Sequence, residues 1–190
     1  MNFYTLTSKV YDILDVTYFA KKEKNPRVAI NKLIRDENAR ILDMCCGTLS
    51  NTIPIAKNHK TAKLVGIDIS KQMLQVAHKK IAKNHLNNIC LKKLDATDTS
   101  LKSNMFDYVV IGLVLHEISP SLRERILKEA HRVLKSSGSL IVLEWEKPES
   151  IFQKIIYFPL LISEQVLCKT FWEFYNCDKS QFFKENNFKV

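Results

Sequence analysis

The sequence predicts an α/β fold built around a parallel sheet. Short apolar runs alternate along the chain with amphipathic segments of helical periodicity, which is the pattern of repeated strand–helix units. With 190 residues, of which 46% are hydrophobic and 26% are charged, the chain fits one globular domain with a substantial core. Only four glycines and five prolines are present, so the composition excludes a disordered tail, a fibre and a repeat array.

Five segments have the composition of strands. Each is short, rich in aliphatic residues and bounded by polar or turn-forming residues. They are Arg40–Met44, Lys63–Asp68 and the segments 88–94, 106–113 and 138–146. Because parallel strands need a crossover between them, we expect a helix in each long gap.

Helices are predicted between these strands. Ser70 is in position to cap a helix over Lys71–Lys83, and Ser121 with Glu124 has the spacing of a capping box at the start of a later helix. The apolar face of the first of these helices comprises Met73, Ala77 and Ile81. The apolar face of the later one comprises Leu122, Ile126, Ala130 and Val133.

Two flanking segments complete the single predicted domain. Residues 1–37 are expected to form an N-terminal helical cap, with a helix at about 7–20 and a linker-like stretch at 21–26. Residues 38–147 form the predicted core, and residues 148–190 form an aromatic-rich C-terminal segment. Its aromatic side chains fit either a lid over an apolar ligand or ordinary core packing.

The net charge of +9, from 29 Lys and Arg against 20 Asp and Glu, raises the question of a nucleic-acid or membrane partner. Lys far outnumbers Arg, and the lysines are scattered along the chain instead of forming one run. Arg is the better residue for bidentate phosphate contacts. The charge therefore favours a solvated lysine surface, and no nucleic-acid partner is expected.

The five cysteines are odd in number, and none forms a C-x-x-C pair or lies at metal-ligand spacing from a His. We therefore expect no metal site and a reduced, cytoplasmic setting. Charged residues near the start of the chain argue against a signal peptide. The longest apolar run, at 155–162, contains Pro159 and is too short for a transmembrane segment.

Acidic residues lie at the ends of the first three predicted strands: Asp43, Asp68 and Asp95. Because the carboxyl ends of parallel strands meet at one edge of an open sheet, where ligands bind, we expect a shared site there. A carboxylate such as Asp68 can accept both hydrogen bonds of a ribose diol. Taken alone, each acid could instead cap a helix or form a turn. Cys45 and Cys46 have no neighbouring His or basic cluster, so we interpret them as small loop residues and not as nucleophiles.

Six motifs follow one another through the predicted core. They are LDMCCGT at 42–48, VGIDISKQML at 65–74, DA at 95–96, FDYVV at 106–110, LHEI at 115–118 and EAHRVLK at 129–135, followed by Gly138. In this order they resemble the motifs of class I S-adenosylmethionine-dependent methyltransferases, and among these the menaquinone and ubiquinone biosynthesis type. Tyr11 and Asp12 also resemble the N-terminal helix of that type. The resemblance covers about residues 8–147 and is specific for the superfamily but much less so for a substrate.

The resemblance implies a Rossmann-like, doubly wound α/β sheet with strand order 3-2-1-4-5. It also implies S-adenosylmethionine as the cofactor and S-adenosylhomocysteine as the product. The antiparallel hairpin with which the family usually ends its sheet is expected to be missing, because the chain stops soon after a predicted helix at 179–187. The fifth strand is then either an exposed edge that pairs with a second copy, giving a homodimer, or is covered in another way.

The resemblance also implies cofactor contacts for residues of these motifs. The loop from Asp43 to Gly47, including Cys45, is expected to hold the methionine end. The other implied contacts are Asp68 with the ribose hydroxyls, Ile69 with the adenine ring, Asp95 with the adenine amino group, the Ala96 backbone with a ring nitrogen, and Gly112 and Leu113 beneath the sulfonium. Leu49 departs from the family pattern, which commonly has glycine at that position.

The implied reaction is methyl transfer to a small, apolar or aromatic acceptor by in-line displacement, in which orientation supplies much of the catalysis. If the acceptor is a phenol or an enol-like carbon, a base must remove its proton. His116 and Glu117 are the candidate catalytic residues, and a packed or capping role is the alternative for His116. The alternative function is a regulatory or partner subunit that binds S-adenosylmethionine without turnover. Nucleic-acid methylation is disfavoured, because Gly-Leu-Val at 112–114 replaces the Asn/Asp-Pro-Pro-aromatic run of such enzymes.

Overall fold

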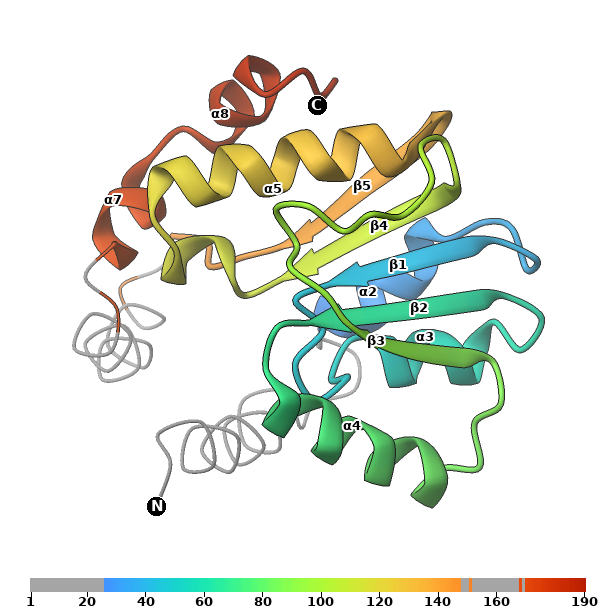
Figure 1. The fold of residues 1–190 in the computed structure, drawn as a ribbon. Helices are drawn as coiled ribbons and strands as arrows, with labels where there is room; N and C mark the ends of the chain where they lie inside the picture. Colours follow the sequence, from blue (N-terminus) through green and yellow to red (C-terminus); the bar gives the residue numbers. More distant parts are fainter. Residues whose placement is uncertain (1–25, 148–150, 152–167, 169) are drawn as a thin grey trace.

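The computed structural model describes residues 26–147, 151, 168 and 170–190, and a five-stranded parallel sheet lies at its centre (Figure 1). The strands are β1 (Arg40–Met44), β2 (Lys63–Asp68), β3 (Ile89–Lys93), β4 (Phe106–Gly112) and β5 (Leu134–Leu143). Their order is β3-β2-β1-β4-β5, and every neighbouring pair is parallel. The predicted fold class and strand order are confirmed.

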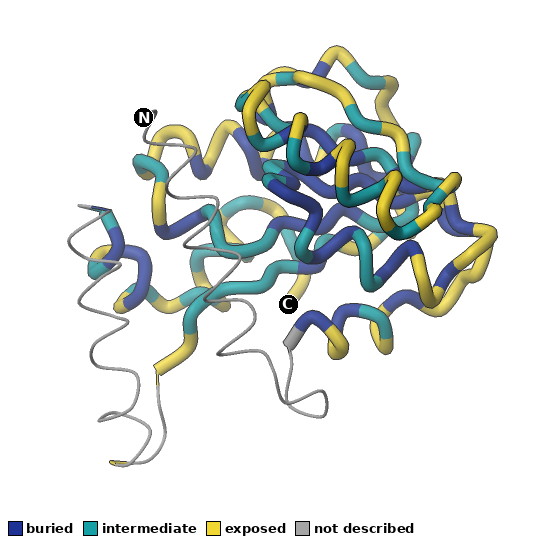
Figure 2. Tube along the Cα trace, turned by 90° about the horizontal axis from the view of Figure 1, so that it is seen from below, coloured by how far each residue is buried: buried dark blue, intermediate teal, exposed yellow. Residues whose placement is uncertain are grey.

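Helices cover both faces of this sheet, with α5 in front of it in Figure 1 and α2 and α3 behind it. The helices are α2 (Pro26–Leu33), α3 (Thr52–Asn58), α4 (Lys71–Lys83), the 3-10 turn η2 (Leu115–Glu117), α5 (Pro120–Val133), α7 (Phe171–Asn176) and α8 (Lys179–Glu185). Figure 2 shows the buried residues mainly in the interior of the molecule and the exposed residues on the outer turns of helices and loops. The alternation of strand and helix is the doubly wound arrangement.

Alternating side chains of the central strands fill two separate cores. Against α5 lie Leu42, Met44, Ile67, Phe106, Val109 and Ile111. On the opposite face, against α2 and α3, lie Ile41, Leu64, Val110 and Ile141. Successive strand residues point to opposite faces, so Asp43, between Leu42 and Met44, points toward the α2 and α3 side. The alternation of side chains along β1 therefore places Asp43, the first acidic residue of the motif, on the α2 and α3 side of the sheet.

The two predicted helix caps have different outcomes. Ser70 caps α4 as expected, because its side chain accepts a hydrogen bond from the backbone N–H of Met73 at 3.2 Å. The predicted capping box at Ser121 and Glu124 is wrong. Helix α5 begins at Pro120, after Ser119, without a side-chain cap. Proline is favoured at the first helical position, since its φ is already helical and its missing N–H has no partner there anyway.

The fifth strand begins earlier than predicted. It starts at Leu134, directly after α5, and its register against β4 shifts between the pair Phe106 with Leu134 and the pair Tyr108 with Ser139. Gly138 lies in this irregular stretch, where a Cβ atom would be 2.9 Å from the Leu134 side chain. The strand predicted at 138–146 therefore overlaps only the regular part of β5, and it also extends past the observed end at Leu143.

Several predictions fall outside the described residues. These are the N-terminal helix at 7–20, the linker except for Pro26, which begins α2, and the parts of the aromatic-rich segment at 148–150, 152–167 and 169. In the described part of the C-terminal segment, Phe174 of α7 and Phe182 of α8 form an edge-to-face pair at 5.3 Å that packs on the α5 core. No described strand follows β5, and pairing of its edge with a second copy stays a prediction. No described helix is both long and apolar enough to cross a membrane.

Candidate cofactor site

A cavity of about 430 Å³ opens where β1, β2, β3 and β4 end. The predicted site residues among those that line it are Cys45, Gly47, Asp68, Ile69, Asp95, Ala96, Gly112, Leu113 and Glu117. The structure thus brings residues from four separate strand ends to one concave site. Asp43 and His116 do not line the cavity, and each is 2% exposed.

The loop after β1 has an unusual backbone. Cys45, Gly47 and Leu49 all have left-handed conformations, with φ of 58°, 52° and 68°. Two hydrogen bonds hold the loop to β2: the Gly47 N–H donates to Asp68 Oδ2 and the Cys46 N–H to the Ile67 carbonyl, each at 2.9 Å. The alternating left-handed residues turn the chain sharply, so its backbone can approach a ligand closely.

Leu49 adopts the conformation for which glycine is best suited. A left-handed residue with a Cβ is disfavoured by about 1–2 kcal/mol. The Leu49 side chain is fully buried in a small core with Leu74 and Ala77. Full burial of a leucine contributes about 1.5–3 kcal/mol, which offsets the backbone strain. Leucine at this position is therefore compatible with a tight loop.

Asp68 holds two segments of the site together. Its Oδ2 accepts from the Gly47 N–H at 2.9 Å, and its Oδ1 accepts from the Ser70 N–H at 2.8 Å. The carboxylate thereby joins the loop after β1 to the start of α4 while lining the cavity. Since a carboxylate has about four acceptor sites, it retains capacity for a ligand hydroxyl.

Asp43 supports the loop from beneath. Its Oδ2 accepts a hydrogen bond from the Thr52 hydroxyl at the start of α3, and its buried Oδ1 has no hydrogen-bond partner among the described residues. Burial raises the pKa of Asp43 from its ordinary 3.8 to about 7, although the Thr52 hydrogen bond and the charge of Arg27 lower it. Direct contact between Asp43 and a ligand in the cavity is therefore not part of this geometry.

Two further cavity residues were missed by sequence reasoning. Arg27 of α2 donates through Nε to Oδ1 of Asn51 at 3.0 Å, and both side chains are buried and line the cavity. Gly112 makes room for this pair, because a Cβ there would lie 2.2 Å from Asn51 Nδ2. No motif includes Arg27, and only the tertiary packing of α2 brings its charge to the loop.

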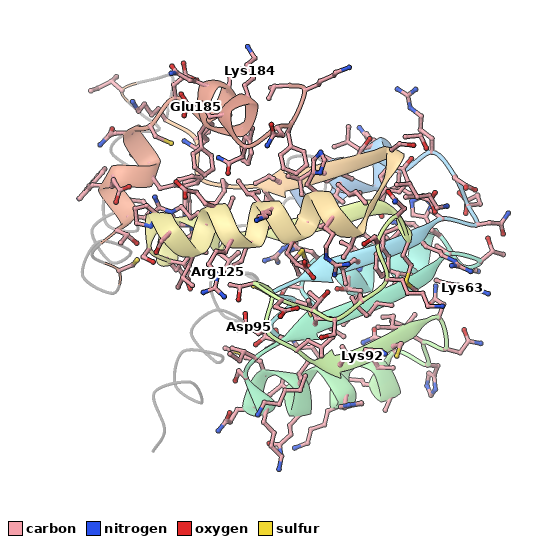
Figure 3. The ribbon with its side chains drawn as sticks, turned by 45° about the horizontal axis from the view of Figure 1, so that its top comes forward. Lys63, Lys92, Asp95, Arg125, Lys184 and Glu185 are labelled. Atoms are coloured by element: carbon pink, nitrogen blue, oxygen red, sulfur yellow. The ribbon has the colours of Figure 1, made fainter. Side chains whose placement is uncertain are left out.

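The loop after β3 provides another wall. Asp95 Oδ1 accepts from the Thr97 N–H at 2.8 Å, and this backbone hydrogen bond lowers the pKa of Asp95. Arg125 of α5 donates to the Thr97 hydroxyl at 2.9 Å, and Figure 3 labels Asp95 and Arg125 on these neighbouring segments. Asp95 thus forms the turn that the sequence offered as an alternative, and it also lines the cavity. Ile69, another lining residue, is 66% exposed.

The loop after β4 forms the floor. Gly112, Leu113 and Val114 line the cavity, and Leu113 has a φ of 57° with its N–H donating to the Leu143 carbonyl at 2.7 Å. Glu117 also lines it. His116, one residue earlier, points into the protein and bonds Glu144 instead. The catalytic roles predicted for His116 and Glu117 stay predictions.

The cysteine thiols of the first loop are protonated. Burial, followed by the neighbouring carboxylates, raises the pKa of Cys45 to about 12, and burial raises that of Cys46 as well. A neutral thiol is a poor nucleophile. This agrees with the interpretation of both cysteines as small loop residues.

A family model described as a methyltransferase domain matches residues 41–138, which is more than half of the chain. The chain belongs to the class I S-adenosylmethionine-dependent methyltransferases. The matched region runs from β1 into β5 and so contains every loop of the cavity.

Named relatives of this methyltransferase chain include demethylmenaquinone methyltransferases. That of Geobacillus sp. (strain WCH70) is 33% identical over 153 residues, or 79% of this chain and 64% of the relative. That of Bacillus pumilus (strain SAFR-032) is 35% identical over 152 residues, with the same two coverages. The chain therefore spans a little under two thirds of the length of these relatives.

The fold of the methyltransferase chain is found in solved structures. A SAM-dependent methyltransferase from Aquifex aeolicus superposes with a TM-score of 0.65 over 84% of this chain and 88% of that one. Its sequence identity is 20%, so this likeness concerns the fold alone.

The cofactor of this methyltransferase family is S-adenosylmethionine. The cavity fits such a molecule: it offers carboxylates for hydroxyl and amino groups at Asp68 and Asp95, and the exposed apolar Ile69 for a ring. A buried guanidinium, that of Arg27, also lines the cavity and is hydrogen-bonded to Asn51, which follows the left-handed loop. These groups match a ligand with a ribosyl-adenine half and an amino-acid half.

Proposed function

We propose that this chain transfers the methyl group of S-adenosylmethionine to a reduced quinone ring or a similar small aromatic acceptor. The observation that carries the proposal is that residues from the ends of β1, β2, β3 and β4 line one shared cavity. The acceptor class is supported by relatives named demethylmenaquinone methyltransferase. Reduced quinones are phenols, whose ring carbons become nucleophilic when a hydroxyl loses its proton.

The adenosine half is held by the loops after β2 and β3. Asp68 accepts hydrogen bonds from the ribose hydroxyls, and Ile69 packs on the adenine ring. Asp95 accepts from the adenine amino group, while the backbone of Ala96 meets a ring nitrogen. The exposure of Ile69 supports this role, because a large apolar side chain at a cavity mouth gains from being covered by a flat ring.

The methionine half lies over the loop after β1. Cys45 and Gly47 bring backbone close to it, and Arg27 attracts its carboxylate, since a buried guanidinium is well suited to a planar anion. Asp43 acts indirectly, by fixing Thr52 and the loop above it. Gly112 and Leu113 form the floor beneath the sulfonium.

Methyl transfer requires mainly that the reacting atoms are aligned. S-adenosylmethionine carries its own leaving group, so the acceptor atom, the methyl carbon and the sulfur have to be brought into line, which can supply about 7–11 kcal/mol of the barrier. Ile118 and Leu122 line the cavity beside Glu117 and give the acceptor an apolar place. Glu117 removes the proton of the acceptor.

Two measurements test this function. Calorimetry with S-adenosylmethionine and S-adenosylhomocysteine is expected to show one site, with the product bound more tightly. Transfer of a labelled methyl group to a short-chain, reduced demethylmenaquinone is expected only with the purified chain present. Binding without transfer to any of a panel of reduced quinones and phenols would instead support the regulatory or partner subunit. If neither S-adenosylmethionine nor S-adenosylhomocysteine gives a heat of binding, both the methyltransferase function and the regulatory function are contradicted.

A further inference from the structure

A buried carboxylate at the end of β5 holds the loop that carries the candidate base. The side chain of Glu144 is 4% exposed. Its Oε1 accepts from the Leu115 N–H at 2.8 Å and from the Val114 N–H at 3.2 Å, and its Oε2 lies 2.7 Å from His116 Nδ1. A buried carboxylate needs such partners, because its desolvation is otherwise costly. No motif of the sequence singled out Glu144.

The imidazole of His116 is fixed in orientation. Its ring contacts Phe171 edge-to-face, with centroids 5.5 Å apart, and its backbone carbonyl accepts from the Thr170 hydroxyl at 2.8 Å. A carboxylate at Nδ1 selects the imidazole that carries its proton on that nitrogen. The other nitrogen, Nε2, is thereby the proton acceptor of the neutral ring.

The second nitrogen faces Glu117. His116 Nε2 lies 3.9 Å from Glu117 Oε1, and the Glu117 side chain is 35% exposed and lines the cofactor cavity. The three side chains are therefore arranged in sequence, carboxylate, imidazole and carboxylate, from the buried end of β5 to the cavity. The first two are almost completely shielded from water, and only the third reaches the site.

We propose that Glu144, His116 and Glu117 form a proton relay for the acceptor; the proposal rests on the function proposed above. Glu117 takes the proton of the acceptor as the acceptor atom bonds to the methyl carbon, and the C–S electron pair stays on sulfur, giving S-adenosylhomocysteine. The proton is shared with His116 Nε2, and the charge of the imidazolium is balanced by Glu144. After the product leaves, the proton returns through Glu117 to water. Glu144 is a positioning residue, since it acts through His116.

The charged and titratable groups around the relay are few in the described part of the chain. Arg123 of α5 donates to the Leu115 carbonyl at 2.6 Å, and its charge is paired with Glu173 at 3.0 Å. The Cys168 thiol donates to the His116 carbonyl at 3.2 Å. Among the described residues, the anions that face the imidazole are therefore Glu144 at 2.7 Å from Nδ1 and Glu117 at 3.9 Å from Nε2.

The decisive variant is Glu144→Gln. The amide oxygen still accepts from the Leu115 N–H, but the charge is lost and the amide N–H₂ faces His116 Nδ1. We expect S-adenosylmethionine affinity and KM to stay within about twofold, and kcat at neutral pH to fall at least tenfold. An anion within 4–6 Å raises the pKa of a base by about 1–3 units, so the acid limb of the kcat profile is expected to move down by about one pH unit or more.

Three companions keep the experiment decisive. Glu146→Gln, at an exposed glutamate two positions along, is the matched control and should leave the profile unchanged. His116→Gln tests the relay if Glu144→Gln fails to fold, and should lower kcat while retaining cofactor affinity. Nitrogen-15 NMR should show His116 with its proton on Nδ1 in the wild type and on Nε2 in Glu144→Gln.

The outcomes separate the two proposals. If the wild type transfers methyl groups and Glu144→Gln keeps both its kcat profile and its imidazole proton position, the relay is overturned while the function stands. An equal loss in Glu146→Gln also overturns it. A wild type that binds the cofactor but methylates none of the acceptors removes the proposed function, and the relay falls with it.

Discussion

At the residue scale, the site depends on carboxylates with different environments. Asp68 is bound by two backbone N–H groups at the cavity wall, whereas Asp43 is buried beneath the loop. Asp95 is exposed and fixed by a turn. Three aspartates at similar strand-end positions thus differ in environment. Asp68 lines the cavity and also holds backbone, Asp43 is buried beneath the loop, and Asp95 is exposed to solvent. The expected results of replacing Asp68 and of replacing Asp43 therefore differ.

Asp68→Asn is expected to weaken S-adenosylhomocysteine binding about 10- to 100-fold, because hydrogen bonds to charged groups contribute about 1.5–3 kcal/mol. Calorimetry measures this affinity. Asp98→Asn, at an exposed acid outside the cavity, is the matched control and should bind like the wild type. Equal affinity in Asp68→Asn and the wild type would contradict the proposed ribose contact.

Asp43 predicts a pH dependence of stability. Its pKa is about 7 in the folded protein and 3.8 ordinarily, so between these values the folded chain holds a proton that the unfolded chain has released. Stability therefore falls as pH rises, by about 3 kcal/mol between pH 5 and pH 8 from this group alone. Urea unfolding of Asp43→Asn and of the wild type measures this dependence. The free energy of unfolding of the wild type should fall relative to that of the variant as pH rises. A constant difference would show that Asp43 is ionised in the fold.

The left-handed conformation of Leu49 predicts that a glycine substitution there destabilises the protein less than an alanine substitution. Leu49→Ala keeps the left-handed strain and loses the buried side chain, for a cost of about 2–5 kcal/mol. Leu49→Gly loses the same packing but relieves about 1 kcal/mol of backbone strain. We therefore expect the glycine variant to unfold at a higher urea concentration than the alanine variant. The reverse order would argue against a left-handed Leu49.

At the element scale, bounds set by local signals were predicted correctly, whereas the starts of α5 and β5 were not. β1, β2 and α4 have the predicted bounds, because their apolar periodicity, and for α4 the Ser70 cap, are local signals. The start of α5 was misread, since Ser121 has capping-box spacing but Pro120 already begins the helix. The early start of β5 depends on register with β4, which no local pattern contains.

The corrected helix start can be tested by a pair of substitutions. Ser70→Ala removes the side chain that accepts from the Met73 N–H and should destabilise the protein by about 1 kcal/mol. Ser121→Ala should change stability by less than about 0.5 kcal/mol, because that serine does not cap α5. Chemical denaturation of the two variants measures both values. A loss at Ser121 as large as at Ser70 would restore the capping box.

At the scale of the whole molecule, the edges of the sheet have different characters. β3 ends the sheet on one side with exposed Lys92 and Lys93, and charged side chains protect an edge from association. β5 ends it on the other side, and we expect two copies of the chain to pair there. Sedimentation equilibrium should give twice the mass of the chain, and a monomer at all concentrations would contradict the pairing.

The tertiary parts of the site were the least predictable from sequence. Asp68, Asp95 and the loop at 45–50 follow from local motifs, and the structure brings them to one cavity, whereas Asp43 is buried beneath the loop. Arg27, Asn51 and Glu144 reach it, or support it, only through packing between elements distant in the sequence. The burial of His116 agrees with the packed role that the sequence left open, and its catalytic role stays a prediction.

We propose that one cavity at the strand ends binds the adenosyl cofactor. A crystal structure of the chain with S-adenosylhomocysteine tests this binding most directly. We expect the ribose hydroxyls at Asp68, the adenine against Ile69 and the methionine carboxylate toward Arg27. A ligand bound elsewhere, or one in the cavity with its two ends exchanged, would contradict it.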